Sequence, residues 1–243
     1  MKRPVCAIVG AGEGLGQALA AKFSQQGCDL ALISRSEQGS KKALQAASKA
    51  DSKGRVLFEQ ADASHPESIE NAFARIRDEL GVVNILIYNA RGSFESCDPL
   101  EMSYSQLQEV FNIEVLGAYA AAKSVIPDMQ KLGAGTLLYS SATAAFRGSA
   151  SFPLYAIGKF GLRGLTQSLA KAYGKHGVHV AHMRLDCDLD VPVMKDLYGD
   201  QYDPSVLAKP KDVAETYWWV HTQPKGAWSN EVDIRPSFEN WSI

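Results

Sequence analysis

Short apolar runs recur along the chain and alternate with longer segments of helical periodicity. The strand-like runs are Val5–Val9, Asp29–Ile33, Arg55–Glu59, Asn84–Tyr88, Gly135–Tyr139, Val178–Arg184 and a late Glu231–Ile234. Helical spacing of apolar residues marks Leu15–Gln26, Glu37–Ala50, Pro66–Leu80, Tyr104–Leu132 and Leu154–Lys175. Because strands that alternate with helices form right-handed β-α-β crossovers, the pattern predicts an α/β fold. We expect a doubly wound parallel sheet of about seven strands, with helices on both faces.

The chain shows no internal repeat, low-complexity run or linker, so we expect one domain over residues 1–243. Residues 188–210 break the alternation after the sixth predicted strand, at the edge where open α/β sheets bind ligands. A long irregular segment at this edge favours a lid over a site. The alternative is a surface excursion with short helices.

Composition changes this picture little and narrows the classes of function. The 243 residues are 46% hydrophobic and 21% charged, with a formal net charge of −2, which is ordinary for a soluble globular protein. A charge so close to zero gives no general attraction to nucleic acid or to an anionic membrane. No apolar stretch approaches the ~20 residues of a membrane span. We therefore expect a cytoplasmic protein with neither kind of partner.

Cysteine and histidine positions argue against a disulfide framework and a metal site. Four cysteines are scattered without a C-x-x-C pair, which favours reduced thiols. His179 and His182 lie in a predicted strand, where a spacing of three places them on opposite faces. We expect no metal.

A glycine-rich segment joins the first strand to the first helix, in the order Gly10-Ala11-Gly12-Glu13-Gly14-Leu15-Gly16. Glycines let a backbone approach a pyrophosphate, and the amides of the following helix then face the anion. The common G-x-G-x-x-G spacing fails because Leu15 replaces the third glycine. Gly10, Gly14 and Gly16 instead fit G-x-x-x-G-x-G, and here the chain resembles the short-chain dehydrogenase/reductase family.

That resemblance covers roughly residues 4–221 and implies further contacts to a nicotinamide dinucleotide. Asp62-Ala63 after the third strand resembles the pair that contacts adenine, and Asn89-Ala90 after the fourth resembles the stretch on the adenosine side, with Arg91 in place of the family's glycine. The expected cofactor contacts are Gly10, Gly12, Glu13, Gly14, Leu15, Gly16, Ser34, Arg35, Asp62, Ala63, Asn89, Ala90, Lys159 and Leu189.

The end of the second strand indicates which dinucleotide is preferred. Ser34 and Arg35 stand where proteins that select NAD usually carry an acid for the ribose hydroxyl. A guanidinium suits a 2′-phosphate through charge-assisted hydrogen bonds, which favours NADP(H) over NAD(H). Two readings oppose this preference: Glu13 brings negative charge into the glycine loop, and Arg35 can be a solvated surface charge.

The catalytic candidates open the long helix after the fifth strand, in Tyr155-Ala-Ile-Gly-Lys159. Positions i and i+4 share a helix face, so the phenol and the ammonium can point into one pocket. A nearby ammonium and an oxidised nicotinamide are both expected to lower the phenol pKa from about 10 and to fit Tyr155 for proton exchange. The family resemblance implies an oxidoreductase that interconverts a small-molecule carbonyl and alcohol by hydride transfer.

The resemblance also implies a serine that hydrogen-bonds the substrate oxygen. In many relatives it precedes the tyrosine by thirteen residues, a position held here by Ala142. Ser141 is displaced by one, and a small insertion before Gly148 would absorb the difference. Ser141 is the favoured candidate, with Ser140 and Thr143 as alternatives.

Several departures from the family pattern open a different function. Glu114 replaces an asparagine that supports a water chain to the lysine, so it could pair with Lys159 and relay protons, or pin the lysine away. Asp186-Cys187 replaces Pro-Gly, and Val191 replaces a threonine. The alternative is a catalytically impaired redox sensor or interaction protein that binds dinucleotide. In either case the resemblance implies a homodimer or homotetramer.

Overall fold

One seven-stranded parallel sheet forms the centre of the molecule. The computed structural model describes residues 2–238; residues 1 and 239–243, which the predicted single domain includes, lie outside the description. The sheet order is β3-β2-β1-β4-β5-β6-β7. Its strands are β1 (Val5–Val9), β2 (Asp29–Ser34), β3 (Val56–Gln60), β4 (Val83–Tyr88), β5 (Gly135–Ala142), β6 (Val178–Leu185) and β7 (Glu231–Ile234). The predicted fold class is confirmed.

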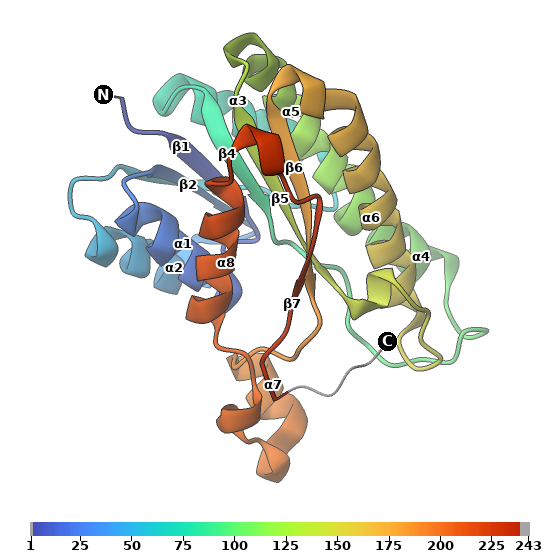
Figure 1. The fold of residues 1–243 in the computed structure, drawn as a ribbon. Coiled ribbons are helices and arrows are strands. Elements are labelled where there is room, and N and C mark those ends of the chain that lie inside the picture. The colour runs from blue at the N-terminus through green and yellow to red at the C-terminus, as the bar shows by residue number, and fades with distance from the viewer. Residues whose placement is uncertain (1, 239–243) are drawn as a thin grey trace.

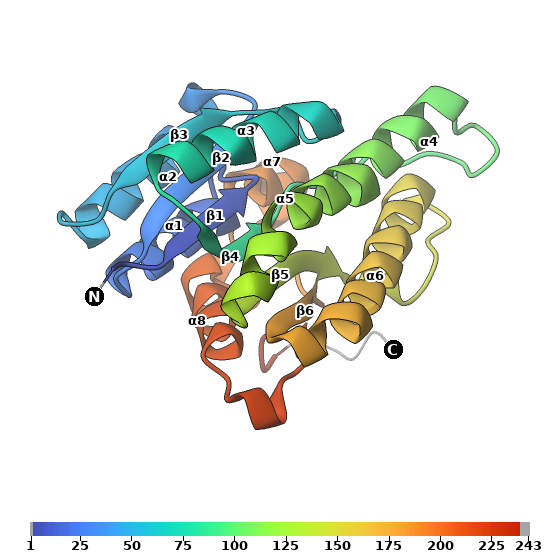
Figure 2. The same cartoon turned by 90° about the horizontal axis from the view of Figure 1, so that it is seen from above.

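Helices cover both faces of this sheet, as Figures 1 and 2 show. The α-helices of the described residues are α1 (Leu15–Gln25), α2 (Glu37–Ala50), α3 (Pro66–Glu79), α4 (Tyr104–Phe111), α5 (Ala118–Leu132), α6 (Pro153–Tyr173), α7 (Pro192–Tyr198) and α8 (Pro210–His221). One core cluster joins the sheet to α1, α2 and α8, and the other joins it to α3, α5 and α6. Within residues 2–238, no helix has the length and apolarity needed to cross a membrane.

The single helix predicted over Tyr104–Leu132 is interrupted by a π-helical segment, Asn112–Gly117. A close approach explains the wider turn, because a Cβ on Gly117 would lie 2.3 Å from the carbonyl oxygen of Ala63. The hydroxyl of Tyr88 donates a hydrogen bond to the carbonyl of Ile113 and satisfies an acceptor within the wide turn. The segment directs Glu114 into the interior, where it is fully buried.

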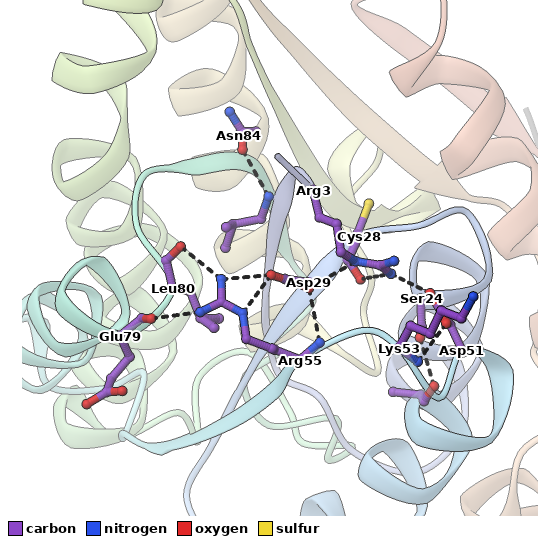
Figure 3. Close-up of polar contacts among 12 residues, drawn as sticks. Arg3, Ser24, Cys28, Asp29, Asp51, Lys53, Arg55, Glu79, Leu80 and Asn84 are labelled. Carbon is purple, nitrogen blue, oxygen red and sulfur yellow. Dashed lines mark hydrogen bonds and ion pairs between the residues drawn. The ribbon is translucent and has the colours of Figure 1, made fainter. Parts of the chain in front are cut away.

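An ion-pair cluster ties together the amino ends of the first three strands (Figure 3). The carboxylate of Asp29 accepts from Nε of Arg3 at 3.0 Å, and from the backbone and Nε of Arg55 at 3.0 and 2.9 Å. Arg3 also pairs with Asp51. Burial raises the pKa of Asp29, but the hydrogen bonds and charges of Arg55 and Arg3 outweigh burial and leave it below its ordinary value. The cluster lies at the end of the sheet opposite the carboxyl edge.

We expect Asp29→Asn to lower the free energy of unfolding at pH 7 by roughly 1–3 kcal/mol, because two guanidinium groups lose their shared carboxylate. The folded-state pKa lies below the unfolded one, so the stabilisation is present above about pH 4 and is lost as pH falls through the folded pKa. In urea titrations, the free energy of unfolding of the variant should therefore approach that of the unmodified chain as the pH is lowered. The exposed Glu101→Gln is the control, and a pH-independent difference would contradict the ion-pair explanation.

Candidate active site

The glycine loop turns sharply between β1 and α1, and packing explains two of its glycines. Gly10 has φ +85°, and a Cβ there would lie 2.5 Å from the amide nitrogen of Ala90. A Cβ on Gly16 would lie 2.7 Å from the carbonyl oxygen of Gly10. Gly12 differs, since no described atom would lie within 4 Å of its Cβ. The loop is therefore closely packed at Gly10 and Gly16 and open at Gly12.

A cavity of about 980 Å³ runs from this loop along the carboxyl edge of the sheet. Several predicted site residues line it together: Gly10, Glu13, Leu15, Asn89, Ser141, Tyr155, Lys159 and Leu189. The loop after β6 and the start of α7 form another wall, which includes Val191 and Met194. Val191 packs on the glycine loop, because a Cβ on Gly14 would lie 2.7 Å from its Cγ1. Among residues 2–238, no group of three or more His, Cys, Asp or Glu side chains could hold a metal.

Other predicted contacts lie beside the cavity rather than in its lining. Gly12, Gly14, Gly16 and Ala90 belong to the glycine loop and the segment beside it. Ser34 ends β2, Arg35 follows it, and Asp62 and Ala63 follow β3. The Ser34 hydroxyl hydrogen-bonds within its own turn, to the carbonyl of Ser36 and the hydroxyl of Ser40. Arg35 is exposed, and its charge reaches the carboxylate of Asp62.

Charge at the loop is more balanced than the sequence indicates. Glu13, whose negative charge disfavours a phosphorylated ribose, forms an ion pair with Lys42 of α2. Burial raises the pKa of Asp62, but hydrogen bonds from Ser64 and the nearby charges of His65 and Arg35 leave it below its ordinary value. The negative charge of Glu13 is therefore compensated by a neighbouring ammonium.

Lys159, which lines the cavity, forms a buried ion pair with Glu114, which lies behind the lining. Nζ of Lys159 lies 2.9 Å from a carboxylate oxygen of Glu114 and donates to the carbonyl of Ser140 at 3.2 Å. The other carboxylate oxygen of Glu114 accepts from the amide of Gly92 at 2.9 Å. Burial lowers the pKa of Lys159, but Glu114 and then Tyr155 raise it above its ordinary value. The lysine is therefore a cation held between β5 and the π-helical segment.

Tyr155 lies above this pair, with Nζ of Lys159 5.5 Å from its ring centroid. We expected the ammonium to lower the phenol pKa. The ammonium does lower it, but burial and the Glu114 carboxylate act the other way, and the pKa of Tyr155 is raised. Arg91 lowers the pKa and Asp188 raises it, each more weakly. The phenol therefore carries its proton at neutral pH.

The three candidate hydroxyls have different partners. The hydroxyl of Ser140 accepts from that of Tyr217 at 2.8 Å, and the hydroxyl of Thr143 donates to Asp186. The hydroxyl of Ser141 is buried and has no hydrogen-bond partner within residues 2–238. Among the three, it is therefore the hydroxyl that no described residue satisfies.

Several residues that line the cavity were not among the predicted site residues, including Arg91, Phe94, Arg147 and Phe152. Two signals were available. Arg91 directly follows the Asn89-Ala90 pair at a carboxyl strand end, and Phe152 precedes Tyr155 by one helical turn. Phe94 and Arg147 lie in irregular segments, where no periodicity indicates which way a side chain points.

The cavity fits a nicotinamide dinucleotide by shape and by donor chemistry. Open space at Gly12 admits a phosphate close to backbone amides, and the α1 amino end faces the same loop. At the far end, Ser141, whose hydroxyl has no partner among residues 2–238, and Tyr155 line the same cavity. An extended ligand that is anionic at one end and reactive at the other matches this arrangement.

Comparisons with known proteins agree with this description. The family model of the short chain dehydrogenases matches residues 4–187. An uncharacterised oxidoreductase of Staphylococcus epidermidis is 24% identical over 236 residues, which span 97% of this chain and 98% of that protein. A counterpart from Staphylococcus aureus is 26% identical over 235 residues, or 96% of each chain.

Solved structures share the fold. An alcohol dehydrogenase of Thermococcus sibiricus, complexed with 5-hydroxy-NADP, has a TM-score of 0.85 at 21% identity and covers 99% of this chain and 100% of that one. L-Sorbose reductase of Gluconobacter frateurii, complexed with NADPH and L-sorbose, also reaches 0.85 at 20% identity, over 96% of this chain and 95% of that one.

The Rossmann-like sheet and the cavity at its carboxyl edge define a dinucleotide-dependent oxidoreductase. With the family model covering most of its length, the chain belongs to the short-chain dehydrogenase family and is a nicotinamide-dependent enzyme of that family.

Proposed function

We propose that this single-domain chain interconverts a carbonyl and an alcohol, with NADP(H) preferred and Tyr155 as the acid/base. The observation that carries the proposal is the meeting of Ser141, Tyr155 and Lys159 in the same cavity as the glycine loop. Residues 188–210 close this cavity as a lid, a role supported by the contact of Val191 with Gly14.

In the proposed mechanism, a bound nicotinamide dinucleotide supplies or accepts the hydride. Ser141 donates its free hydroxyl hydrogen to the substrate oxygen and fixes the carbonyl beside Tyr155. Tyr155 gives its proton to that oxygen during reduction and takes it back during oxidation. Lys159 stabilises the phenolate left after proton transfer, and Glu114 keeps the lysine in place.

The resident cofactor would be held by the glycine loop, by Asp62-Ala63 and Asn89-Ala90, and by Leu189 and Lys159. Preference for NADP(H) is supported by exposed Arg35 at the end of β2 and by Lys42, which neutralises Glu13. A 2′-phosphate near two cations and a compensated acid gains charge-assisted hydrogen bonds that a hydroxyl cannot make.

We expect the chain to bind NADPH more tightly than NADH, with Arg35→Asp reversing the order because a carboxylate repels the phosphate and accepts from the ribose hydroxyls. Fluorescence titration measures the affinity for each dinucleotide, and the ratio of NADPH affinity to NADH affinity should fall by about tenfold or more in the variant. Lys175→Asp, exposed in the turn before β6 at the opposite end of the sheet, is the charge-matched control. Equal affinities in the unmodified chain would contradict the preference.

Tyr155→Phe should lower kcat by roughly 10²–10⁴-fold, because the substrate oxygen loses its proton donor, while NADPH affinity stays within about threefold. Ser141→Ala should lower kcat by roughly 10²–10³-fold. Turnover is screened with aldehydes, ketones and quinones by nicotinamide absorbance. Ser140→Ala and Thr143→Val serve as controls, since their hydroxyls are already bonded within the protein. If Thr143→Val loses more activity than Ser141→Ala, the assignment of the oxyanion donor is wrong.

The Glu114–Lys159 pair biases the site toward reduction. A lone ammonium would favour the phenolate, whereas a neutralised ammonium beside a buried phenol leaves Tyr155 protonated, the form that a carbonyl needs. Besides these groups, Arg91 and Asp188 act on the phenol with opposite signs. Alcohol oxidation, which requires the phenolate, should therefore be fastest in alkali.

Glu114→Gln removes one of the charges that raise the pKa of Tyr155, so the pKa should fall. The pH profile of alcohol oxidation should then move to lower pH, with little change in NADPH affinity. Exposed Glu109→Gln is the control. An unmoved profile would contradict the electrostatic role of Glu114. A large gain in overall turnover would instead favour the second candidate, an impaired dinucleotide-binding sensor in which Glu114 pins the lysine.

We also propose a homodimer or homotetramer that works in the cytoplasm. Four large side chains on adjoining helices are partly exposed, namely Phe111, Tyr119, Ile157 and Phe160, and such a patch favours self-association. Free thiols at all four cysteines support a reducing compartment. Light scattering measures the mass, and a value near the 26.4 kDa monomer would exclude the oligomer.

A further inference from the structure

Two arginines in the cavity have no counter-ion within residues 2–238. Arg91 and Arg147 both line the cavity and are exposed, and no described carboxylate lies within ion-pair distance of either one. Most other charged lining residues are already paired: Glu13 with Lys42, Lys159 with Glu114, and Asp186 with Arg235. The cavity therefore presents two cationic side chains whose charge the protein does not neutralise.

Arg91 stands close to the reacting group. Its guanidinium carbon is 5.5 Å from the ring centroid of Phe94, whose ring meets that of Tyr155 edge to face at 5.0 Å. The charge of Arg91 lowers the pKa of both Tyr155 and Lys159, an effect that falls off with distance. Arg147 enters from the loop between β5 and α6, six residues after Ser141 at the end of β5.

An apolar wall lines the cavity beside Arg91 and Tyr155. The rings of Phe94 and Phe152 stack with centroids 4.7 Å apart and planes within 9°. From the start of α7, Val193 and Met194 contribute further apolar lining. A planar or aliphatic body can lie along this wall with its carbonyl at Tyr155 and one end at the arginines.

We propose that the substrate is a carbonyl compound in which an apolar body carries one anionic group, a carboxylate or a phosphate, bound by Arg91 and Arg147. This inference rests on the proposed function and names its substrate class. Guanidinium groups hold such anions with two parallel hydrogen bonds, which fixes orientation as well as affinity.

Asp188 sets where the anion can lie. It lines the same cavity, accepts a hydrogen bond from the Tyr198 hydroxyl, and belongs to the loop after β6. An anion placed beside it would be repelled, so the anionic end belongs on the side of Arg91 and Arg147, toward β4 and the loop before α6. The carbonyl then lies at Tyr155, between the opposed charges.

A matched pair of ligands tests the charge requirement without turnover. Calorimetry with 3-phenylpropanoate and 3-phenylpropanamide, on the chain with and without saturating NADPH, compares an anion with a neutral analogue of the same shape. We expect the acid to bind about tenfold or more tightly than the amide, the size of one charge-assisted hydrogen bond. 3-Phenylpropylphosphonate distinguishes a carboxylate site from a phosphate site by whether it binds better than the acid.

Variants then assign the residues. Arg91→Gln and Arg147→Gln should each bring the acid-to-amide ratio toward one, while Lys131→Gln, at the exposed end of α5, should leave it unchanged. If Arg91→Gln weakens NADPH binding and leaves the ratio intact, Arg91 serves the dinucleotide phosphates, and its part of the inference is overturned. Equal binding of acid and amide by the unmodified chain overturns the whole inference.

Turnover separates this inference from the proposed function. With NADPH, 4-carboxybenzaldehyde should be reduced with a higher kcat/KM than its methyl ester, and both arginine variants should lose that preference. Reduction of the ester at least as fast as the acid overturns the substrate class and leaves the carbonyl reductase intact. Selective binding of the acid with no turnover of any carbonyl supports the anion site and refutes the proposed function.

Discussion

The buried contact between Glu114 and Lys159 constrains the whole carboxyl edge of the sheet. Removing two charges from water costs several kcal/mol per ion, which is offset only when the geometry is good and the remaining polar positions are satisfied. Here the Gly92 amide and the Ser140 carbonyl complete the set. The partners come from the loop after β4, the π-helical segment, β5 and α6. Displacement of the π-helical segment or α6 would leave a charge buried and unpaired, and displacement of the other two would remove a hydrogen bond from it.

Close packing makes this contact geometrically possible. A Cβ on Gly158 would lie 2.7 Å from Cγ of Glu114 and from Cγ1 of Val110, so the helix can approach the π-helical segment only without a side chain there. Gly158 separates Tyr155 from Lys159 in the sequence, and it therefore shares in positioning both. The wide turn at Asn112–Gly117 supplies the other half of the fit by turning Glu114 inward.

Regular elements could be predicted from the sequence because their periods are set by the backbone. Runs such as Val5–Val9 and Glu37–Ala50 match the structure at both ends. The Tyr155–Lys159 pair could be predicted for the same reason, because positions i and i+4 share a helix face. The glycine loop could be predicted from the spacing of its glycines between a strand and a helix. The π-helical segment could not be, since its cause is a contact with Ala63, some fifty residues away. The raised pKa of Tyr155 and the cavity position of Arg147 likewise depend on burial and loop path, which no local pattern encodes.

The two sides of helix α6 have different surroundings. Tyr155 and Lys159 turn toward the cavity, while Ile157 and Phe160, from the same two turns, are 42% and 46% exposed on the outside. A helix is stiff over so short a length, so a shift of its outer side moves the inner side with it. Substitutions at the outer positions that shift the helix would therefore also move the two side chains that line the cavity. Any substitution that reshapes the exposed side of α6 must therefore leave the helix where it keeps Tyr155 and Lys159 turned toward the cavity.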